Sequence, residues 1–106
     1  FDYKAYGGLC HHFTKIVLRS GLCQAVAFYT VKASGGSNKQ VYQEFLKHMA
    51  IASGNGEMAH LDFQKRIQSL ELDQYRHTTR RILAAAIWYK RFAVSLLGVD
   101  QTGDDQ

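Results

Sequence analysis

The chain contains no proline and no uninterrupted apolar run of the roughly 18 residues that a membrane span requires. Proline breaks helices and favours turns, so its absence favours a helical chain over a turn-rich β-sandwich. The sequence also opens without a charged-then-apolar leader that ends in a small-residue cleavage site. These absences predict a soluble, cytoplasmic and largely helical protein.

Cysteine is scarce: the chain has only Cys10 and Cys23, and both stand among apolar residues. Reduced thiols of this kind are typical of the core of a cytoplasmic protein, so we expect no structural disulfide. Cys10 is followed by His11 and His12, but this cluster lacks the paired ligand spacings of zinc sites. The sequence therefore predicts no metal site and no cofactor.

Groups arranged for catalysis are also missing from the sequence pattern. The histidines fall on different predicted helices, without a paired carboxylate placed for acid–base chemistry. They are His11, His12, His48, His60 and His77. No glycine-rich phosphate loop precedes a helix, and Thr78 and Thr79 are expected on a helix surface. We therefore expect a chain that is not an enzyme by itself.

Acidic residues are absent from two long stretches, Tyr3–Gln43 and Gln74–Val99. The net charge is only +4, from 13 Lys and Arg against 9 Asp and Glu, but the acids gather in Glu57–Asp73 and after Val99. Such segregation produces faces of one sign, which are typical of proteins that bind polyanions or acidic partners. An ordinary solvated surface is the alternative.

Apolar spacing predicts a first helix at about residues 3–19, with a break at Ser20-Gly21. The second segment, "LCQAVAFYTV", is apolar on nearly every side, which predicts a helix in the middle of a bundle. A third helix is expected after the loop "SGGSN", opened by a capping box of Ser37 and Gln40.

A weaker fourth helix is predicted from the spacing of Phe63, Ile67 and Leu70. A fifth is expected to begin with Asp73 as its cap and to end at Gly98, with a tail after that glycine. The pattern shows no internal repeat and no clean strand alternation. The sequence therefore predicts a single all-α domain, residues 1–106, built as a small bundle of about five helices.

The last predicted helix has an unusual distribution of charge, because it carries five cations and no acid. At 100° per residue, the arc opposite its apolar face holds Arg76, Arg80, Arg81 and Arg91, and Trp88 falls in this cationic arc. Cations in the first turns oppose the helix dipole at a small cost in stability. An exposed Trp beside arginines can anchor a protein interface or stack on a base. A Trp half-buried against another helix is the third interpretation.

Two motifs support a resemblance to a known family. "LRSGLCQAVAFY" at Leu18–Tyr29 contains a Ser-Gly-Leu step and a Gln-Ala-x-Ala-Phe run. "YRHTTRRILAAAIWYKRFA" at Tyr75–Ala93 contains Tyr-Arg-x-x-Thr and then Trp-x-Lys-Arg. In this order the motifs resemble the small subunit of the Cmr effector complex of type III-B CRISPR systems. Arg81 departs from the acid expected in many relatives, and residues 34–72 match only in length and helicity.

The resemblance implies an all-helical, non-catalytic subunit in an antiviral ribonucleoprotein that degrades complementary invader RNA. Such subunits line the groove that holds the guide RNA–target RNA duplex, and they pack on backbone subunits and on further copies of themselves. Base pairing supplies the specificity, so phosphate contacts suffice. The residues that we expect to contact nucleic acid or a partner are Lys15, Arg19, Arg76, Arg80, Arg81, Trp88, Lys90 and Arg91.

Three other classes of protein remain open at this point. The small subunit of the related type III-A complex shares the role and the helicity, although the Trp-x-Lys-Arg ending favours the Cmr family. A helix-turn-helix DNA-binding regulator would also be small, basic and helical. Its recognition helix, however, exposes polar side chains, whereas the segment after "RSGL" is apolar. A helical subunit of an unrelated enzyme complex is the third class.

Overall fold

The computed structural model describes the backbone of residues 2–105 and the side chains of residues 2–97. Within this part of the chain there are five helices and no strand. The helices are α1 (Tyr3–Ser20), α2 (Leu22–Ser34), α3 (Lys39–Ala52), α4 (His60–Gln68) and α5 (Leu72–Asp105). The prediction of an all-α fold with about five helices is confirmed.

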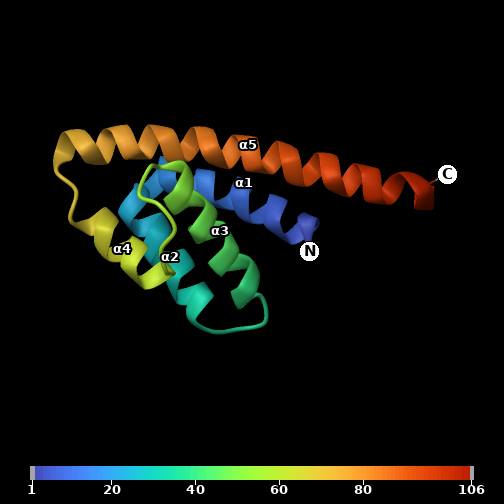
Figure 1. The fold of residues 1–106 in the computed structure, drawn as a ribbon, viewed down its shortest axis with the longest axis horizontal. Coiled ribbons are helices and arrows are strands. Elements are labelled where there is room, and N and C mark those ends of the chain that lie inside the picture. Colours follow the sequence, from blue (N-terminus) through green and yellow to red (C-terminus); the bar gives the residue numbers. More distant parts are fainter. Residues whose placement is uncertain (1, 106) are drawn as a thin grey trace.

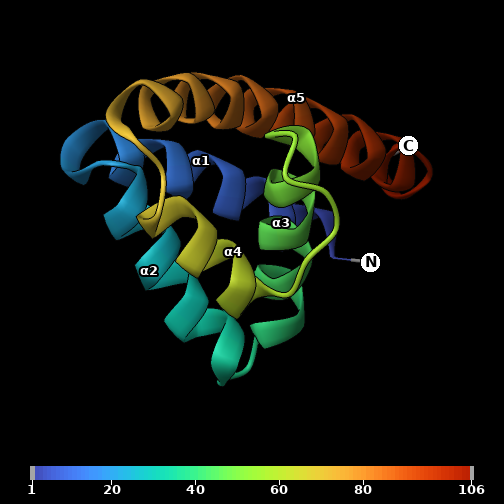
Figure 2. The same cartoon turned by 60° about the vertical axis from the view of Figure 1, so that its left-hand side comes forward.

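Helix α5 determines the shape of the molecule. Its 34 residues, at about 1.5 Å each, account for the 51 Å long axis, whereas the other two axes measure 27 and 26 Å. Helix α1 lies along α5 in the opposite direction, and α2, α3 and α4 form the rest of the bundle (Figure 1). Figure 2 shows α4 lying in front of α2 and α3, with α5 along the top of the bundle.

Three aromatic side chains occupy the centre of the core. Phe13, Tyr29 and Phe45 come from α1, α2 and α3, and each is fully buried. Their ring centroids lie 4.9–5.3 Å apart in tilted or edge-on arrangements, which aromatic pairs favour. The hydroxyl group of Tyr29 donates a hydrogen bond to the carbonyl oxygen of Leu9 at 2.6 Å. Burial raises the pKa of this phenol, so it remains a neutral hydrogen-bond donor.

The predicted break at Ser20-Gly21 is confirmed, and its geometry requires glycine. Gly21 has φ = 91°, a left-handed conformation that L side chains rarely adopt. Its N–H donates a hydrogen bond to the carbonyl oxygen of Val17 at 2.8 Å, which ends α1. Its own carbonyl accepts from Ala25, which begins α2. One residue therefore ends one helix and starts the next.

The expectation that α2 is surrounded by other helices is wrong for one side of it. The helix packs on α1, α3 and α4 and buries Leu22, Val26 and Tyr29. However, Phe28 is 44% exposed and Val31 is 71% exposed. A helix that is apolar on all sides in sequence can still leave one side on the surface of a small domain, because the domain has too few other helices to cover it.

The sequence predicted the existence of each helix correctly, but it predicted the residues at the helix ends less accurately. Asn38 holds the N-cap position of α3, without a side-chain capping bond, so the Ser37–Gln40 capping box is wrong. Asp73 lies inside the first turn of α5, whereas Glu71 accepts the first backbone bond, from Tyr75. Leu70 was assigned to the fourth helix, but α4 ends at Gln68.

The predicted end of the last helix at Gly98 is also wrong, because α5 continues to Asp105. Glycine lowers helix stability by about 1 kcal/mol relative to alanine, but it does not by itself end a helix. The side chains after Leu97 lie outside the described part of the structure. The expectation that the residues after Gly98 behave as a tail therefore stays a prediction.

Candidate interaction surface on helices α1 and α5

Helices α1 and α5 run antiparallel, so the N-terminal half of α1 lies beside the C-terminal half of α5 (Figure 1). Two approaches define their register, and a third fixes the start of α2 against α5. At the start of α2, the N–H of Cys23 donates to the hydroxyl of Tyr75 at 2.9 Å. Further along, the ammonium group of Lys90 contacts His11 Nδ1 at 3.1 Å. Near the start of α1, a Cβ added to Gly7 would lie 3.7 Å from the Cβ of Ala93.

The outward side of α5 carries an arginine stripe, which we define as Arg76, Arg80 and Arg91. All three side chains are exposed. The ion pairs described in the structure are Lys47–Glu57 and the His48–Glu44 contact, and neither involves α5. In the described part of the chain, the arginine stripe therefore presents guanidinium groups that form no ion pair with an acidic side chain.

Arg81 differs from the arginine stripe because the fold itself uses its guanidinium group. Its Nη2 donates a hydrogen bond to the carbonyl oxygen of Ala52 at 3.3 Å. Gly54 lies against the same group, with φ = 86°, and a Cβ built there would be only 3.1 Å from Nη1. Arg81 thus holds the α3–α4 connection against α5, although its side chain remains exposed.

The fold brings one basic residue of α1 into contact with one of α5, namely His11 with Lys90. Lys15 and Arg19 are exposed on α1, and Lys90 is half-buried on α5. His11, which was not among the predicted site residues, lies between the two helices in contact with Lys90. Lys90, and then Lys15, lower the pKa of His11, because a positive neighbour disfavours a charged imidazole. The sequence signal for His11 is its spacing of four residues from Lys15 on one helix.

Trp88 lies on the opposite flank of α5, toward α3, and is 61% exposed. The interpretation of a half-buried Trp packed on a neighbouring helix is therefore wrong. Trp88 and Phe92, which is 56% exposed, have ring centroids 5.9 Å apart. We call these two residues the aromatic pair. It borders a shallow hollow of about 300 Å³ whose other lining residues are Ala52, Ala85 and Tyr89.

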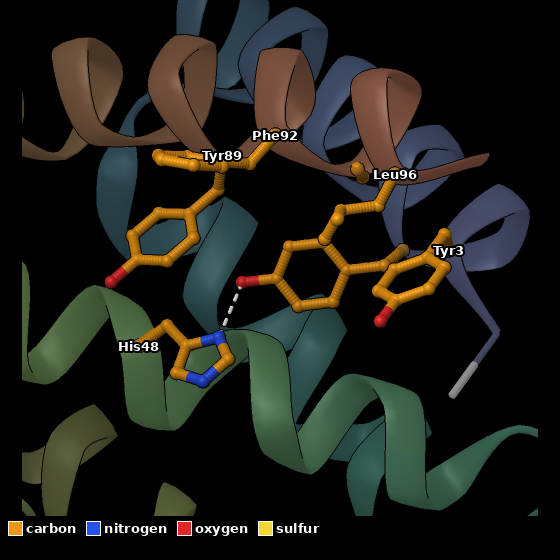
Figure 3. Close-up of a pocket in the computed structure, with 7 residues that line it drawn as sticks. Tyr3, His48, Tyr89, Phe92 and Leu96 are labelled. Atoms are coloured by element: carbon orange, nitrogen blue, oxygen red, sulfur yellow. Dashed lines mark hydrogen bonds between the residues drawn. The ribbon is translucent and has the colours of Figure 1, made fainter. Parts of the chain in front are cut away.

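A second hollow, of about 210 Å³, lies between α1, α3 and α5 (Figure 3). Its polar side is formed by His48, whose ring stacks on Tyr89 with the centroids 5.0 Å apart and the planes 3° from parallel. His48 Nδ1 lies 2.6 Å from the hydroxyl of Tyr6 and Nε2 lies 3.7 Å from a Glu44 oxygen. Burial lowers the pKa of His48, so its ring is neutral at pH 7 and Nδ1 accepts from Tyr6. The cluster ties three helices together.

Two other features of the described residues bear on what the surface binds. Among them, no three His, Cys, Asp or Glu side chains lie close enough together to hold a metal ion. No helix in that part of the chain combines the length and the apolar character needed to cross a membrane. Cys10 is buried and Cys23 is half-buried, and both are free thiols.

The fold and the surface define a small all-helical domain with one cation-rich side and an exposed aromatic pair. A sequence model of the family described as "CRISPR-associated protein (Cas_Cmr5)" matches residues 2–96. The chain belongs to this CRISPR-associated Cmr5 family. Both motifs that carried the resemblance lie inside the matched residues, and the resemblance is confirmed.

A relative from Thermus thermophilus, named "CRISPR system Cmr subunit Cmr5", is 35% identical to the chain over 82 residues. The matched region covers 77% of this chain and 66% of the relative. Comparison with solved structures gave no significant match. The family match favours the Cmr family over the type III-A small subunit, the DNA-binding regulator and the subunit of an unrelated enzyme complex.

Proposed function

We propose that the chain is a non-catalytic small subunit of a type III-B CRISPR Cmr complex in the cytoplasm, where it takes part in antiviral defence. In this role the arginine stripe lines the groove for the guide RNA–target RNA duplex. The flank with the aromatic pair contacts a neighbouring protein, either a backbone subunit or a further copy of the chain. The name of the Thermus relative supports the assignment to a Cmr complex.

The observation that carries the RNA-binding part is the arginine stripe, whose guanidinium groups form no ion pair with an acid among the described side chains. Arg76, Arg80 and Arg91 fall within roughly 60° of one another at 100° per residue, so they face one direction. A nucleic acid presents a regular row of phosphate anions, and guanidinium groups bind phosphate oxygens with charge-assisted hydrogen bonds. Phosphate contacts carry no sequence information, which suits a subunit that holds a duplex whose sequence is read by base pairing.

The test replaces Arg76, Arg80 and Arg91 with Gln in the assembled complex. Target-RNA binding should weaken for every guide sequence alike, because phosphate contacts are lost. The slope of log affinity against log salt should become shallower by about 0.7–0.9 for each contact removed. The matched control replaces Lys32, Lys39 and Lys65, which are exposed on α2, α3 and α4, with Gln. It removes the same charge but should leave the slope nearly unchanged.

Two results would contradict this assignment. A loss of binding that depends on the guide sequence would contradict a backbone-only role. An unchanged salt slope, combined with loss of the subunit from the complex, would show that the arginine stripe meets an acidic protein surface.

The non-catalytic part of the proposal has a separate test. The purified chain should not cleave RNA in the presence of Mg²⁺ or Mn²⁺, because the proposed role requires binding alone. Metal-dependent cleavage that copurifies with the chain would contradict this part, provided that a substitution in the chain abolishes the cleavage without unfolding the protein.

A further inference from the structure

We propose that His11, Lys15 and Lys90 form a binding site for a phosphate group of an RNA backbone, and that His11 takes up a proton when the phosphate binds. The proposal rests on the proposed RNA-binding function and identifies one phosphate site within it. It also adds a pH dependence that the arginine stripe cannot provide, because arginine stays charged throughout the physiological range.

The geometry of the Lys90–His11 contact determines which imidazole nitrogen faces outward. Lys90 Nζ lies 3.1 Å from His11 Nδ1. An ammonium group has three N–H donors and no acceptor, so Nδ1 must be the acceptor. A neutral ring that accepts at Nδ1 carries its proton on Nε2. The pair therefore has unused donors, namely Nε2–H of His11 and the remaining N–H groups of Lys90, that an anion between α1 and α5 can accept from.

The charges around His11 all have the same sign. Lys90 faces it from α5, while Lys15, one turn along α1, and His12 face it from its own helix. None of the ion pairs described in the structure links an acid to this group. The two lysines hold the pKa of His11 below its usual value, so the ring is neutral in the free protein. The site is therefore cationic and has one histidine that can still be protonated.

A bound phosphate reverses the electrostatic balance at His11. Its negative charge offsets the two ammonium groups and directly stabilises a protonated ring, so the pKa of His11 rises on binding. The proton comes from solvent and binds at Nδ1, so the hydrogen bond that Nδ1 accepts from Lys90 is lost and the ammonium group of Lys90 donates to the phosphate instead. Beyond Lys90, a mainly apolar hollow lined by Ile87, Arg91, Val94 and Ser95 lies between this site and the rest of the arginine stripe, with Lys90 and Arg91 on its border. The next stretch of an RNA backbone can continue along this surface.

The experiment measures the pKa of His11 by NMR in the purified chain, free and saturated at low salt with a short RNA duplex of arbitrary sequence. The pKa should rise on binding, and the Kd should fall about threefold or more between pH 8 and pH 6 because of the linked proton. Two further probes are inorganic phosphate and polyglutamate, each at matched charge concentration. A rise with inorganic phosphate equal to that with RNA would overturn the RNA assignment. A rise with polyglutamate alone would assign the site to an acidic protein.

Variants separate His11 from its neighbours. His11→Gln should abolish the pH dependence of duplex binding, because a glutamine side chain takes up no proton between pH 8 and pH 6. His12→Gln removes the adjacent exposed imidazole and should retain the pH dependence. Lys90→Gln should raise the pKa of free His11 and reduce the salt slope by about 0.7 or more. If His11→Gln keeps the full pH dependence, or if the pKa of His11 does not move with saturating RNA, the proposal is wrong.

This failure is distinguishable from failure of the proposed function. If the arginine-stripe variant lowers the salt slope of the assembled complex while His11 shows no RNA-linked change in pKa, the RNA role stands and the site does not. If the salt slope of RNA binding changes neither in the arginine-stripe variant nor in Lys90→Gln, both the proposed RNA-binding function and the phosphate site at His11 are wrong.

Discussion

The hydroxyl of Tyr75 accepts a hydrogen bond from the backbone N–H of Cys23, 52 residues earlier in the chain, at a distance of 2.9 Å. Gly21 occupies the N-cap of α2 and has no side chain to satisfy the first N–H groups of that helix. Tyr75 therefore provides the capping oxygen from the start of α5. The two sequence motifs that carry the family resemblance thus contact each other at this point.

Tyr75→Phe should lower the free energy of unfolding by about 1 kcal/mol, because it removes a capping acceptor from a half-buried N–H. Tyr42→Phe is the matched control, since Tyr42 is also half-buried and the structure describes no hydrogen bond of its hydroxyl group. Urea denaturation of both variants measures the difference. Equal effects of the two substitutions would contradict the capping role.

The glycines of α1 and of its end should respond in opposite directions to alanine. Gly8 is exposed in the helix and a Cβ there meets nothing within 4 Å, so Gly8→Ala should stabilise the protein by roughly 0.5–1 kcal/mol. Gly21→Ala should destabilise it, because φ = 91° strains any L side chain. Thermal unfolding of the two variants checks the signs, and a stabilising Gly21→Ala would show that the turn is not required.

His48 should make the fold less stable in mild acid. Burial lowers its pKa in the folded state below the unfolded value of about 6.5, so the unfolded chain binds the proton more readily. The stability that neutral His48 contributes to the fold is fully present above the pKa of the unfolded state. It is lost as the pH falls through the lower pKa of the folded state. Protonation also gives Nδ1 a hydrogen, which removes the acceptor for Tyr6.

The measurement is urea denaturation at pH 7.5 and 5.5. The drop in stability between these pH values should shrink in His48→Gln and persist in His77→Gln, which replaces an exposed histidine of α5. An unchanged drop in His48→Gln would assign the pH dependence to other groups.

Trp88→Ala should leave the isolated fold intact but weaken incorporation into the complex. The side chain is 61% exposed, and exposed Trp is enriched among residues that dominate protein interfaces. Circular dichroism tests the fold, and copurification with the other subunits tests assembly. Leu18→Ala removes another exposed apolar side chain, on α1, and should have little effect on assembly. Unfolding of the isolated Trp88→Ala protein would show that Trp88 belongs to the core.

The sequence predicted the helices well because amphipathic spacing records which side of each helix is buried. The angular positions on α5 predict Trp88 on the side away from the apolar face, and the structure confirms this: Trp88 is 61% exposed, whereas Ile82, Ala86 and Ala93 are buried. The N-cap residues were predicted less well, because several neighbouring polar side chains can each accept a hydrogen bond from the first N–H groups of a helix. At α2 the capping group comes from Tyr75, which no local pattern reveals.

The candidate site was only partly predictable for a related reason. A wheel shows which cations share one helix, but contacts between helices depend on their register. His11 and Lys90 are 79 residues apart, and only the antiparallel packing of α1 on α5 brings them together. The packing of α3 against α5 separates Arg81 from the arginine stripe, because the carbonyl oxygen of Ala52 at the end of α3 binds its guanidinium group.

The continuity of α5 fixes the spacing of the charges that it carries. Arg76 and Arg91 are 15 residues apart on one uninterrupted helix, which separates their Cα atoms by about 22 Å along its axis. A helix packed along its length does not stretch to follow a ligand, so the side chains can adjust but the spacing of their attachment points cannot. The distances between the arginines along α5 are therefore fixed, and a binding partner must present its anions at intervals that match these distances.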